Sequence, residues 1–285
     1  DWFTNKETTL EYLKENSQAF WNEIEKTASQ NLNLPTEVNI PPASHRFKIV
    51  IPFYNCEKWI HKCLQSIKRQ NYKNFKCILI DDISTDNSAE IIEDVIKDDD
   101  RFALITNKEK KFALANIVDA IDTTENEEDD VIILLDGDDW LASSKTLDKL
   151  CDAYTDDVLM TYGSYVYNPT GKKGVEPSEY PEEVVKTNSF RKDIWRASHL
   201  RTFKYKLWKH LDKNDLKKDN EYYEMTYDQA IMLPLLEMSA ERSRYIPEVL
   251  HVYNKENPLN VDKIKAQKQS ALAREIREKK PYTRI

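Results

Sequence analysis

The first half of the chain alternates short apolar runs with longer stretches in which apolar residues recur every three or four positions. The short runs predict buried strands at 47–52, 75–80, 102–105 and 131–135. The longer stretches predict helices at 57–70, 88–97 and 111–121. Strands that alternate with helices of this length predict an α/β fold, with a mainly parallel sheet and right-handed crossovers.

The segments on either side of this region follow different patterns. Residues 1–30 have apolar positions at helical spacing and are followed by prolines, so we expect 1–45 to be a helical extension and linker. Beyond residue 141 we expect strands at 161–167 and 245–253, a buried helix at 228–238 and an exposed loop at 171–181. Residues 190–209 are aromatic and basic, and 256–285 form a basic, helical C-terminal tail.

The predicted strand at 131–135 ends in a cluster of carboxylates, Asp136, Asp138 and Asp139. Clustered like charges repel and resist desolvation, and a divalent cation would remove that penalty. Carboxylate oxygens suit Mg²⁺ or Mn²⁺, which in turn bind nucleotide phosphates. The alternative is an acidic turn in which Asp139 is the N-cap of the next helix.

A second acidic pair, Asp81 and Asp82, follows the predicted strand at 75–80. Ligands of parallel α/β sheets bind at the carboxyl ends of the strands, which is where both acidic groups lie. We therefore expect the two groups to share one ligand site.

Composition narrows the class of protein. A formal net charge of −8 over 285 residues argues against a general nucleic-acid binder. The four cysteines form no CxxC pair, which favours buried, reduced thiols. Neither a signal peptide nor an apolar run long enough to span a bilayer is visible, so we expect a cytoplasmic protein.

Three motifs occur in order along the first half: IVIPFYN at 49–55, LIDDISTD at 79–86 and LDGDD at 135–139. Their order and spacing resemble those of GT-A fold glycosyltransferases of family 2, and the resemblance covers 47–254. It implies a Rossmann-like, mixed but mainly parallel sheet. It also implies transfer of a sugar from a nucleotide donor, usually with inversion and with Mn²⁺ or Mg²⁺. The domain would be 46–255, with a nucleotide-sugar-binding half at 46–140 and an acceptor-binding half at 141–255.

The resemblance implies roles for individual donor-site residues. Pro52, Phe53 and Tyr54 match the segment that lines the nucleoside pocket, although a turn that ends a strand would also explain them. Asp82 matches a carboxylate that accepts a hydrogen bond from uracil, which implies a UDP-sugar. Its alternative role is an N-cap or turn residue.

The acidic motif itself matches the family's DxD pattern. Asp136 resembles the first Asp, near the ribose and the metal, and Asp138 resembles the last, a direct metal ligand, with Gly137 between them. His251 follows the last predicted strand, and some GT-A enzymes complete the metal shell with a late histidine. A structural histidine is the alternative.

The helix before the acidic motif departs from the family. Members often carry Gly and then Arg-Asn there, whereas this chain has KFALAN at 111–116. Asn116 fits the Asn of that pattern, and Lys111 is the candidate for the missing positive charge. The segment therefore lacks the Gly and the Arg of the family's pattern.

An inverting transfer needs a general base near the acceptor hydroxyl. Family 2 enzymes carry an acidic residue on a helix after the DxD motif, and Asp228 matches it, with Glu224 as the second choice. An Asp at a helix N-terminus also has a purely structural explanation. For the diphosphate or the acceptor, the chain offers the cations His199 and Arg201 and the neighbours of the motif, Asp139 and Trp140.

The proposed reaction is transfer of a sugar from a UDP-sugar to a hydroxyl of a glycan, a protein-linked sugar or a lipid-linked sugar. Two alternatives stay open, a sugar-nucleotide nucleotidyltransferase and an inactive nucleotide- or sugar-binding module. The first usually needs a Gly-rich phosphate loop near the first strand, and none of the four glycines lies there. The basic tail predicts either a solvated helix or peripheral contact with an anionic membrane.

Overall fold

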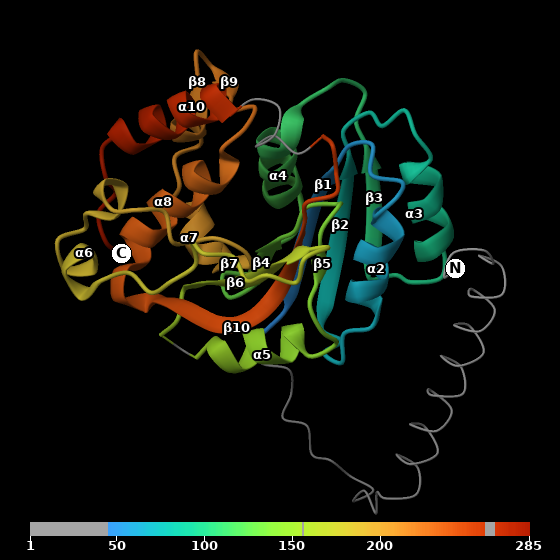
Figure 1. The fold of residues 1–285 in the computed structure, drawn as a ribbon, viewed down its shortest axis with the longest axis horizontal. Helices are drawn as coiled ribbons and strands as arrows, with labels where there is room; N and C mark the ends of the chain where they lie inside the picture. Colours follow the sequence, from blue (N-terminus) through green and yellow to red (C-terminus); the bar gives the residue numbers. More distant parts are fainter. Residues whose placement is uncertain (1–44, 156, 260–265) are drawn as a thin grey trace, which may run out of the picture. The chain divides into compact units, whose positions relative to one another are not determined.

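The computed structural model describes residues 45–155, 157–259 and 266–285 (Figure 1). The predicted extension over 1–44 lies outside the described residues. The first half contains the predicted strands, β1 (Phe47–Phe53), β2 (Phe75–Asp81), β3 (Phe102–Thr106) and β4 (Val131–Leu134). Between them lie the predicted helices, α2 (Ile60–Lys68), α3 (Ser88–Ile96) and α4 (Phe112–Thr123).

These strands form one half of an eight-stranded sheet with the order β3-β2-β1-β4-β7-β6-β10-β5. Strand β1 pairs in parallel with both β2 and β4, and β2 pairs in parallel with β3. Because all four strands run the same way, the acidic residues that follow β2 and β4 lie at one edge of the sheet. The predicted class, a mixed α/β sheet flanked by helices, is confirmed.

The other half of the sheet comes from the rest of the chain. Strand β6 (Met160–Asn168) pairs in parallel with β10 (Ser243–Asn254), and β5 (Trp140–Leu141) pairs antiparallel with β10. Strand β7 (Arg201–Lys204) joins the halves through antiparallel pairs with β4 and β6. It falls within the aromatic, basic stretch to which the sequence pattern assigned no strand.

Helices cover both faces of the sheet, as the alternation of side chains within its strands requires. In β1, Ile49 and Ile51 enter the cluster formed with α2, α3 and α5 (Thr146–Ala153), whereas Val50 faces the cluster formed with α4 and α8. Helix α8 (Tyr227–Ser239) confirms the predicted buried helix.

The remaining elements are short and connect the larger ones. They are α6 (Glu182–Lys186), η1 (Phe190–Lys192), α7 (Tyr205–Lys209), η2 (Lys213–Leu216), β8 (Lys217–Lys218), β9 (Glu221–Tyr222) and η3 (Ala240–Arg242).

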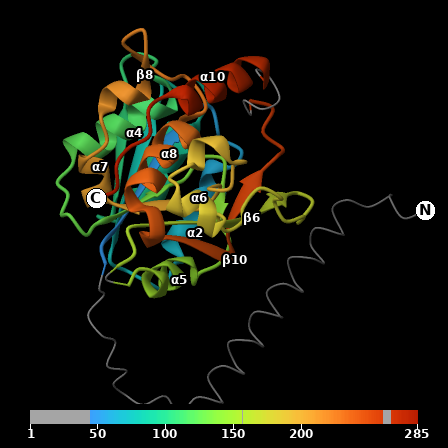
Figure 2. The same ribbon diagram turned by 90° about the vertical axis from the view of Figure 1, so that its left-hand side faces the viewer.

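The C-terminal helix α10 (Ala266–Glu278) packs on the domain, against α8 (Figure 2). Leu272 and Ile276 enter the same apolar cluster as α8. The Arg277 guanidinium donates to the backbone carbonyls of Arg191 and Asp193. The expectation of a solvated helix is therefore wrong for this face, because apolar side chains and an engaged cation hold it on the protein.

A buried ion pair also holds η1 and α8 together beside α10. Arg191 on η1 and Glu237 on α8 are 7% and 0% exposed, and Arg191 Nε lies 2.6 Å from Glu237 Oε1. The Arg191 guanidinium also donates to the carbonyl of Ile276, and Glu237 accepts from the backbone N–H of Tyr282. One carboxylate thus joins η1, α8 and the segment that follows α10.

None of the described helices is both long and apolar enough to cross a membrane.

The buried pair predicts a large effect on stability. Glu237→Ala should lower the free energy of unfolding by about 3–5 kcal/mol, because it leaves a buried guanidinium without its carboxylate. The matched control is Glu241→Ala, which removes the exposed partner of Arg284 and should change stability by about 1 kcal/mol or less. Denaturant midpoints measure both, and equal shifts would contradict the structural role of the buried pair.

Candidate functional site

A cavity of about 310 Å³ opens at the carboxyl ends of β1 and β4. Its lining comes from the end of β1, the turn after β4, the start of β7, the N-terminus of α8 and the segment after β10. The lining residues proposed from the sequence are Pro52, Phe53, Tyr54, Asp136, Gly137, Asp138, His199, Arg201, Glu224 and Asp228. Segments more than 200 positions apart therefore contribute to one pocket.

The turn after β4 approaches β1 very closely. A Cβ atom added to Gly137 would lie 2.5 Å from Phe53 Cβ, which is closer than two carbons can approach. A side chain at this position would push the acidic turn away from the end of β1. Glycine therefore allows the acidic residues and the segment of Pro52 and Tyr54 to line the same pocket.

Asp136 is oriented by a tyrosine at the start of α8. The Tyr227 hydroxyl donates to Asp136 Oδ1 at 2.6 Å, and Arg201 Nη2 lies 3.8 Å from Asp136 Oδ2. Arg201 is only 3% exposed, and its Nη2 also lies 3.1 Å from Nδ1 of His199. A buried guanidinium thus lies beside the acidic motif and lines the pocket.

Asp138 is held by a residue of the C-terminal segment. Asn257 Nδ2 donates to Asp138 Oδ2 at 2.7 Å. Burial raises the pKa of Asp138 to about 8, and the charges of Asp139 and Asp136 add to the effect. A cation at this carboxylate would relieve the repulsion, so the donor chemistry fits a divalent metal.

Asp139 does not cap the following helix. Its Oδ2 lies 2.8 Å from His251 Nε2, and its Oδ1 accepts from the backbone N–H of Asn254 at 2.8 Å. Its partners thus both belong to β10, which holds the acidic turn against that strand. The alternative role of Asp139 as an N-cap is therefore wrong.

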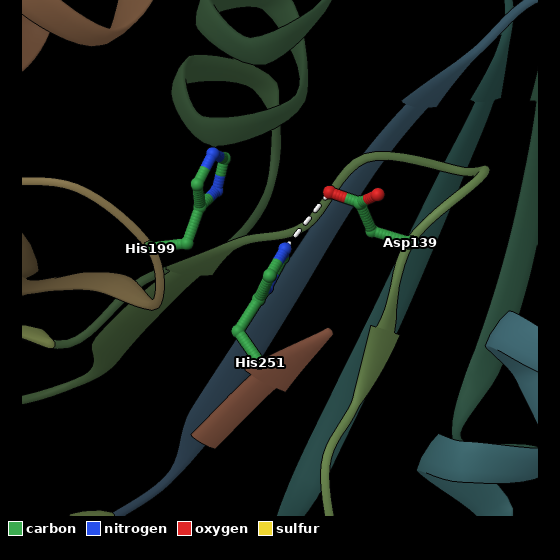
Figure 3. A group of neighbouring side chains, drawn as sticks. All are labelled: Asp139, His199 and His251. Carbon is green, nitrogen blue, oxygen red and sulfur yellow. Dashed lines mark hydrogen bonds and ion pairs between the residues drawn. The ribbon is translucent and has the colours of Figure 1, made fainter. Parts of the chain in front are cut away.

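Asp139, His199 and His251 form a cluster of metal-binding type (Figure 3). One ligand atom of each lies within 4.8 Å of the others. The two imidazole rings stack with centroids 4.4 Å apart, and burial lowers the pKa of His251 to about 3, so its ring is neutral at pH 7. Two neutral imidazoles and a carboxylate are a donor set that suits Mn²⁺ better than Mg²⁺.

Asp228 lies in the first turn of α8 and faces the pocket. Burial raises its pKa, and the positive charge of Arg201 opposes the rise. A carboxylate with a raised pKa is a stronger base, as a general base requires. The second choice, Glu224, also lines the pocket, but its side chain forms an ion pair with Lys268 at 2.5 Å.

Asp82 performs a structural task in this structure. It is 4% exposed, and its oxygens accept from the backbone N–H groups of Lys111 at 2.8 Å and Phe112 at 2.9 Å. These are the first N–H groups of α4, so Asp82 caps that helix from a distance in sequence. Burial alone would raise its pKa, but these hydrogen bonds and one from Asn107 outweigh it and lower the pKa.

Other predicted residues lie outside the pocket, as far as the described residues define its lining. Lys111 Nζ forms an ion pair with Asp119 at 2.8 Å. Asn116 is 1% exposed and accepts a hydrogen bond from Asn107. Trp140 is 7% exposed, with Lys62 Nζ 3.6 Å from its ring centroid.

The sequence pattern missed three residues near the site. Lys110 Nζ lies 3.1 Å from the ring centroid of Tyr54 and 3.3 Å from Asp82 Oδ2, so this lysine places a positive charge beside Tyr54. Tyr227 and Asn257 bind the acidic motif. Of these residues, only Tyr227 could have been suspected from the sequence, because it directly precedes the proposed base, Asp228.

A pocket at the carboxyl ends of the strands, lined by acids and bordered by a buried arginine, is the arrangement in which α/β proteins bind their ligands. The profile described as glycosyl transferase family 2 matches residues 48–219, and the chain belongs to this family. The curated relatives that the chain resembles are named glycosyltransferases.

Curated relatives agree with this family. A Haemophilus influenzae glycosyltransferase is 35% identical over 121 residues, 42% of this chain and 46% of its own length. The Campylobacter jejuni GalNAc(5)-diNAcBac-PP-undecaprenol beta-1,3-glucosyltransferase is 25% identical and aligns over 73% of this chain and 64% of its own length. The chain thus spans less than two thirds of either relative.

Solved structures share the fold. Residues 1–349 of S. aureus TarS, in complex with UDP-GlcNAc, superpose with a TM-score of 0.58 and 17% identity, over 74% of this chain and 59% of that chain. The mannosyltransferase PcManGT from Pyrobaculum calidifontis, in complex with GDP-Man and Mn²⁺, has a TM-score of 0.52 and 17% identity, over 86% of this chain and 66% of its own.

The capping role of Asp82 predicts a pH-dependent loss of stability. Its folded pKa is lowered, so the stabilisation is complete above the unfolded pKa of about 4 and disappears as the pH falls through the folded value. Asp82→Asn should lower the free energy of unfolding at pH 7 by about 1–2 kcal/mol, and the difference from wild type should shrink below about pH 4. Urea denaturation at several pH values tests this, with the exposed Asp152→Asn as control. A difference that does not depend on pH would exclude the capping charge.

Proposed function

We propose that this protein is a metal-dependent glycosyltransferase that moves a sugar from a UDP-sugar to a hydroxyl acceptor with inversion. One observation carries the proposal. The carboxylates of Asp136 and Asp138 and the carboxylate of Asp228 line one pocket of about 310 Å³. A pocket of this size takes a small ligand. Asp136 and Asp138 would bind the metal and the diphosphate of the donor, and Asp228 would act on the acceptor hydroxyl.

The donor would enter at the end of β1. Pro52, Phe53 and Tyr54 line this part of the pocket, and Tyr54 is 41% exposed although Lys110 covers one face of its ring, so a base would stack on the other face. Support for uridine comes from the likeness to TarS with bound UDP-GlcNAc. Asp82 adds little support in this conformation, because its oxygens already accept backbone N–H groups.

Two overlapping donor sets are candidates for the metal. The family pattern suggests Asp136, Asp138 and His251, whereas the geometric cluster combines Asp139, His199 and His251. His251 belongs to both sets. The ion, when bound, would neutralise charge that develops on the leaving diphosphate.

The residues of the chain would perform the rest of the chemistry. Asp228 would accept the proton of the acceptor hydroxyl as that oxygen attacks the anomeric carbon. Arg201, buried beside the acidic motif, would stabilise the departing phosphate through charged hydrogen bonds. Attack from the face opposite the leaving group would invert the anomeric centre.

The acceptor is proposed from the relatives. The Campylobacter jejuni relative is named for an undecaprenol-diphosphate-linked acceptor. We propose that this chain likewise adds a sugar to a lipid-linked saccharide, at the surface of a membrane. No nucleic acid is expected as a partner, because the chain is acidic.

A panel of UDP-, GDP- and CMP-sugars, each with Mn²⁺, Mg²⁺ or EDTA, tests the reaction. We expect metal-dependent release of UDP from one donor, lost in Asp138→Ala. Asp228→Asn should keep nucleotide binding and lose about 10²–10⁴-fold in turnover, the usual contribution of a general base. Asp152→Asn, an exposed change on α5, serves as control. Absence of nucleotide binding with every metal would exclude the proposed reaction.

Mn²⁺ titrations monitored by electron paramagnetic resonance distinguish the two metal sets. His251→Ala should weaken Mn²⁺ binding at least tenfold, because the residue is common to both sets. Equal weakening in His199→Ala would favour the geometric cluster, and an unchanged affinity would favour the family pattern. The exposed His61→Ala is the control. Unchanged binding in His251→Ala would exclude both sets.

A further inference from the structure

Tyr227 is the first residue of α8, and its hydroxyl reaches the acidic motif 91 positions earlier in the chain. It donates to Asp136 Oδ1 at 2.6 Å and accepts from Arg201 Nη2 at 3.3 Å. The Arg201 guanidinium also lies 5.1 Å from the centre of the Tyr227 ring. The tyrosine thus fills the space between the motif and the start of α8.

The backbone that carries Tyr227 is held in a strained conformation. Thr226 has φ of 63°, in the left-handed region that a β-branched residue rarely adopts. It is 6% exposed, its carbonyl accepts from the N–H of Ala230, and its hydroxyl donates to the carbonyl of Gln269. Strain of this kind persists only where the surroundings enforce it, which fixes the direction in which Tyr227 points.

The hydrogen bond also determines how Asp136 presents its second oxygen. Because Tyr227 holds Oδ1, rotation of the carboxylate is restricted, and Oδ2 stays 3.8 Å from Arg201. Tyr227 directly precedes Asp228, which faces the same pocket. A shift of the first turn of α8 would therefore move the proposed base and release Asp136 together.

We propose that Tyr227 is a positioning residue for the nucleotide donor. It fixes Asp136 in the orientation that binds the donor and keeps the proposed base in register with it. The inference rests on the proposed function, because it assigns Asp136 to the donor. It adds a role for the hydroxyl of Tyr227, which touches Asp136 rather than the reacting atoms.

The test is Tyr227→Phe, which removes only the hydroxyl. Calorimetric titration with Mn²⁺ and UDP, or with the nucleoside diphosphate that the wild type binds, should show affinity reduced roughly tenfold or more, as for a lost hydrogen bond to a charged group. In an activity assay, the KM for the sugar donor should rise. A merely structural defect would reduce the fraction of active enzyme, which lowers the apparent kcat and leaves the KM unchanged.

A matched control is available in the same chain. The Tyr282 hydroxyl donates to Asp215 Oδ2, also at 2.6 Å, and neither residue lines the pocket as the described residues define it. Tyr282→Phe removes a tyrosine–aspartate bond of the same length and should leave nucleotide affinity unchanged. Thermal melting of both variants shows whether each is folded.

A double mutant tests whether Tyr227 acts through Asp136. In an Asp136→Ala background, Tyr227→Phe should cause no further loss of nucleotide affinity, because the shared interaction is already gone. Additive losses would overturn the inference. If Tyr227→Phe does not fold, Tyr227→Gln, which keeps an N–H donor, must bind nucleotide more tightly than Tyr227→Met.

Two failures are distinguishable. In the first, the wild-type protein binds nucleotide, and Tyr227→Phe has the same nucleotide affinity and KM as Tyr282→Phe. That result would overturn the inference and leave the proposed function intact. Wild-type protein that binds no nucleotide with any metal would overturn both.

Discussion

The fold depends on how three carboxylates, Asp136, Asp138 and Asp139, are accommodated within four positions at the end of a buried strand. Their mutual repulsion and desolvation would expel them from the end of the sheet unless each found a partner. Each partner comes from a different place: the start of α8, the segment after β10, and β10 itself. The C-terminal half of the chain therefore closes onto the acidic turn, and the same closure forms the pocket.

Two residues near the pocket have a strained backbone conformation that glycine would adopt more easily. Phe112 at the start of α4 and Thr226 before α8 both have positive φ, at 65° and 63°, although neither is glycine. Family members often carry Gly in the segment where this chain has Phe112. Glycine adopts the left-handed conformation most easily, but here a phenylalanine adopts it. Residues held in this way cost roughly 1–3 kcal/mol each and gather at functional sites. At Thr226, which is 6% exposed, buried contacts supply the stability that maintains the strain.

The strand pattern predicted the edge of the sheet at which the acidic residues lie, but among the described residues only the acidic group after β4 lines the pocket. The carboxyl ends of β2 and β4 do lie at one edge of the sheet, because their strands are parallel neighbours of β1. Asp82, however, caps α4, since the N-terminus of that helix points at it with unsatisfied N–H groups. The positive charge beside Tyr54 comes from Lys110 rather than Lys111, because the neighbouring lysine turns toward Asp119. At the start of a helix, adjacent side chains point in different directions, so of these two neighbouring lysines only Lys110 lies beside Tyr54.

The sequence by itself determined the strands and helices of the first half, the family, and the placement of an acidic turn after β4. These features depend on local periodicity and on motifs a few residues long. The tertiary structure decided that 201–204 forms the strand between β4 and β6, and that Tyr227, His251 and Asn257 meet the acidic turn. These partners lie 91, 112 and 119 positions away from the carboxylates that they bind. No local pattern encodes such contacts, because they form only when the packing of α8, β10 and the following segment brings polar groups to carboxylates that are partly or fully removed from water.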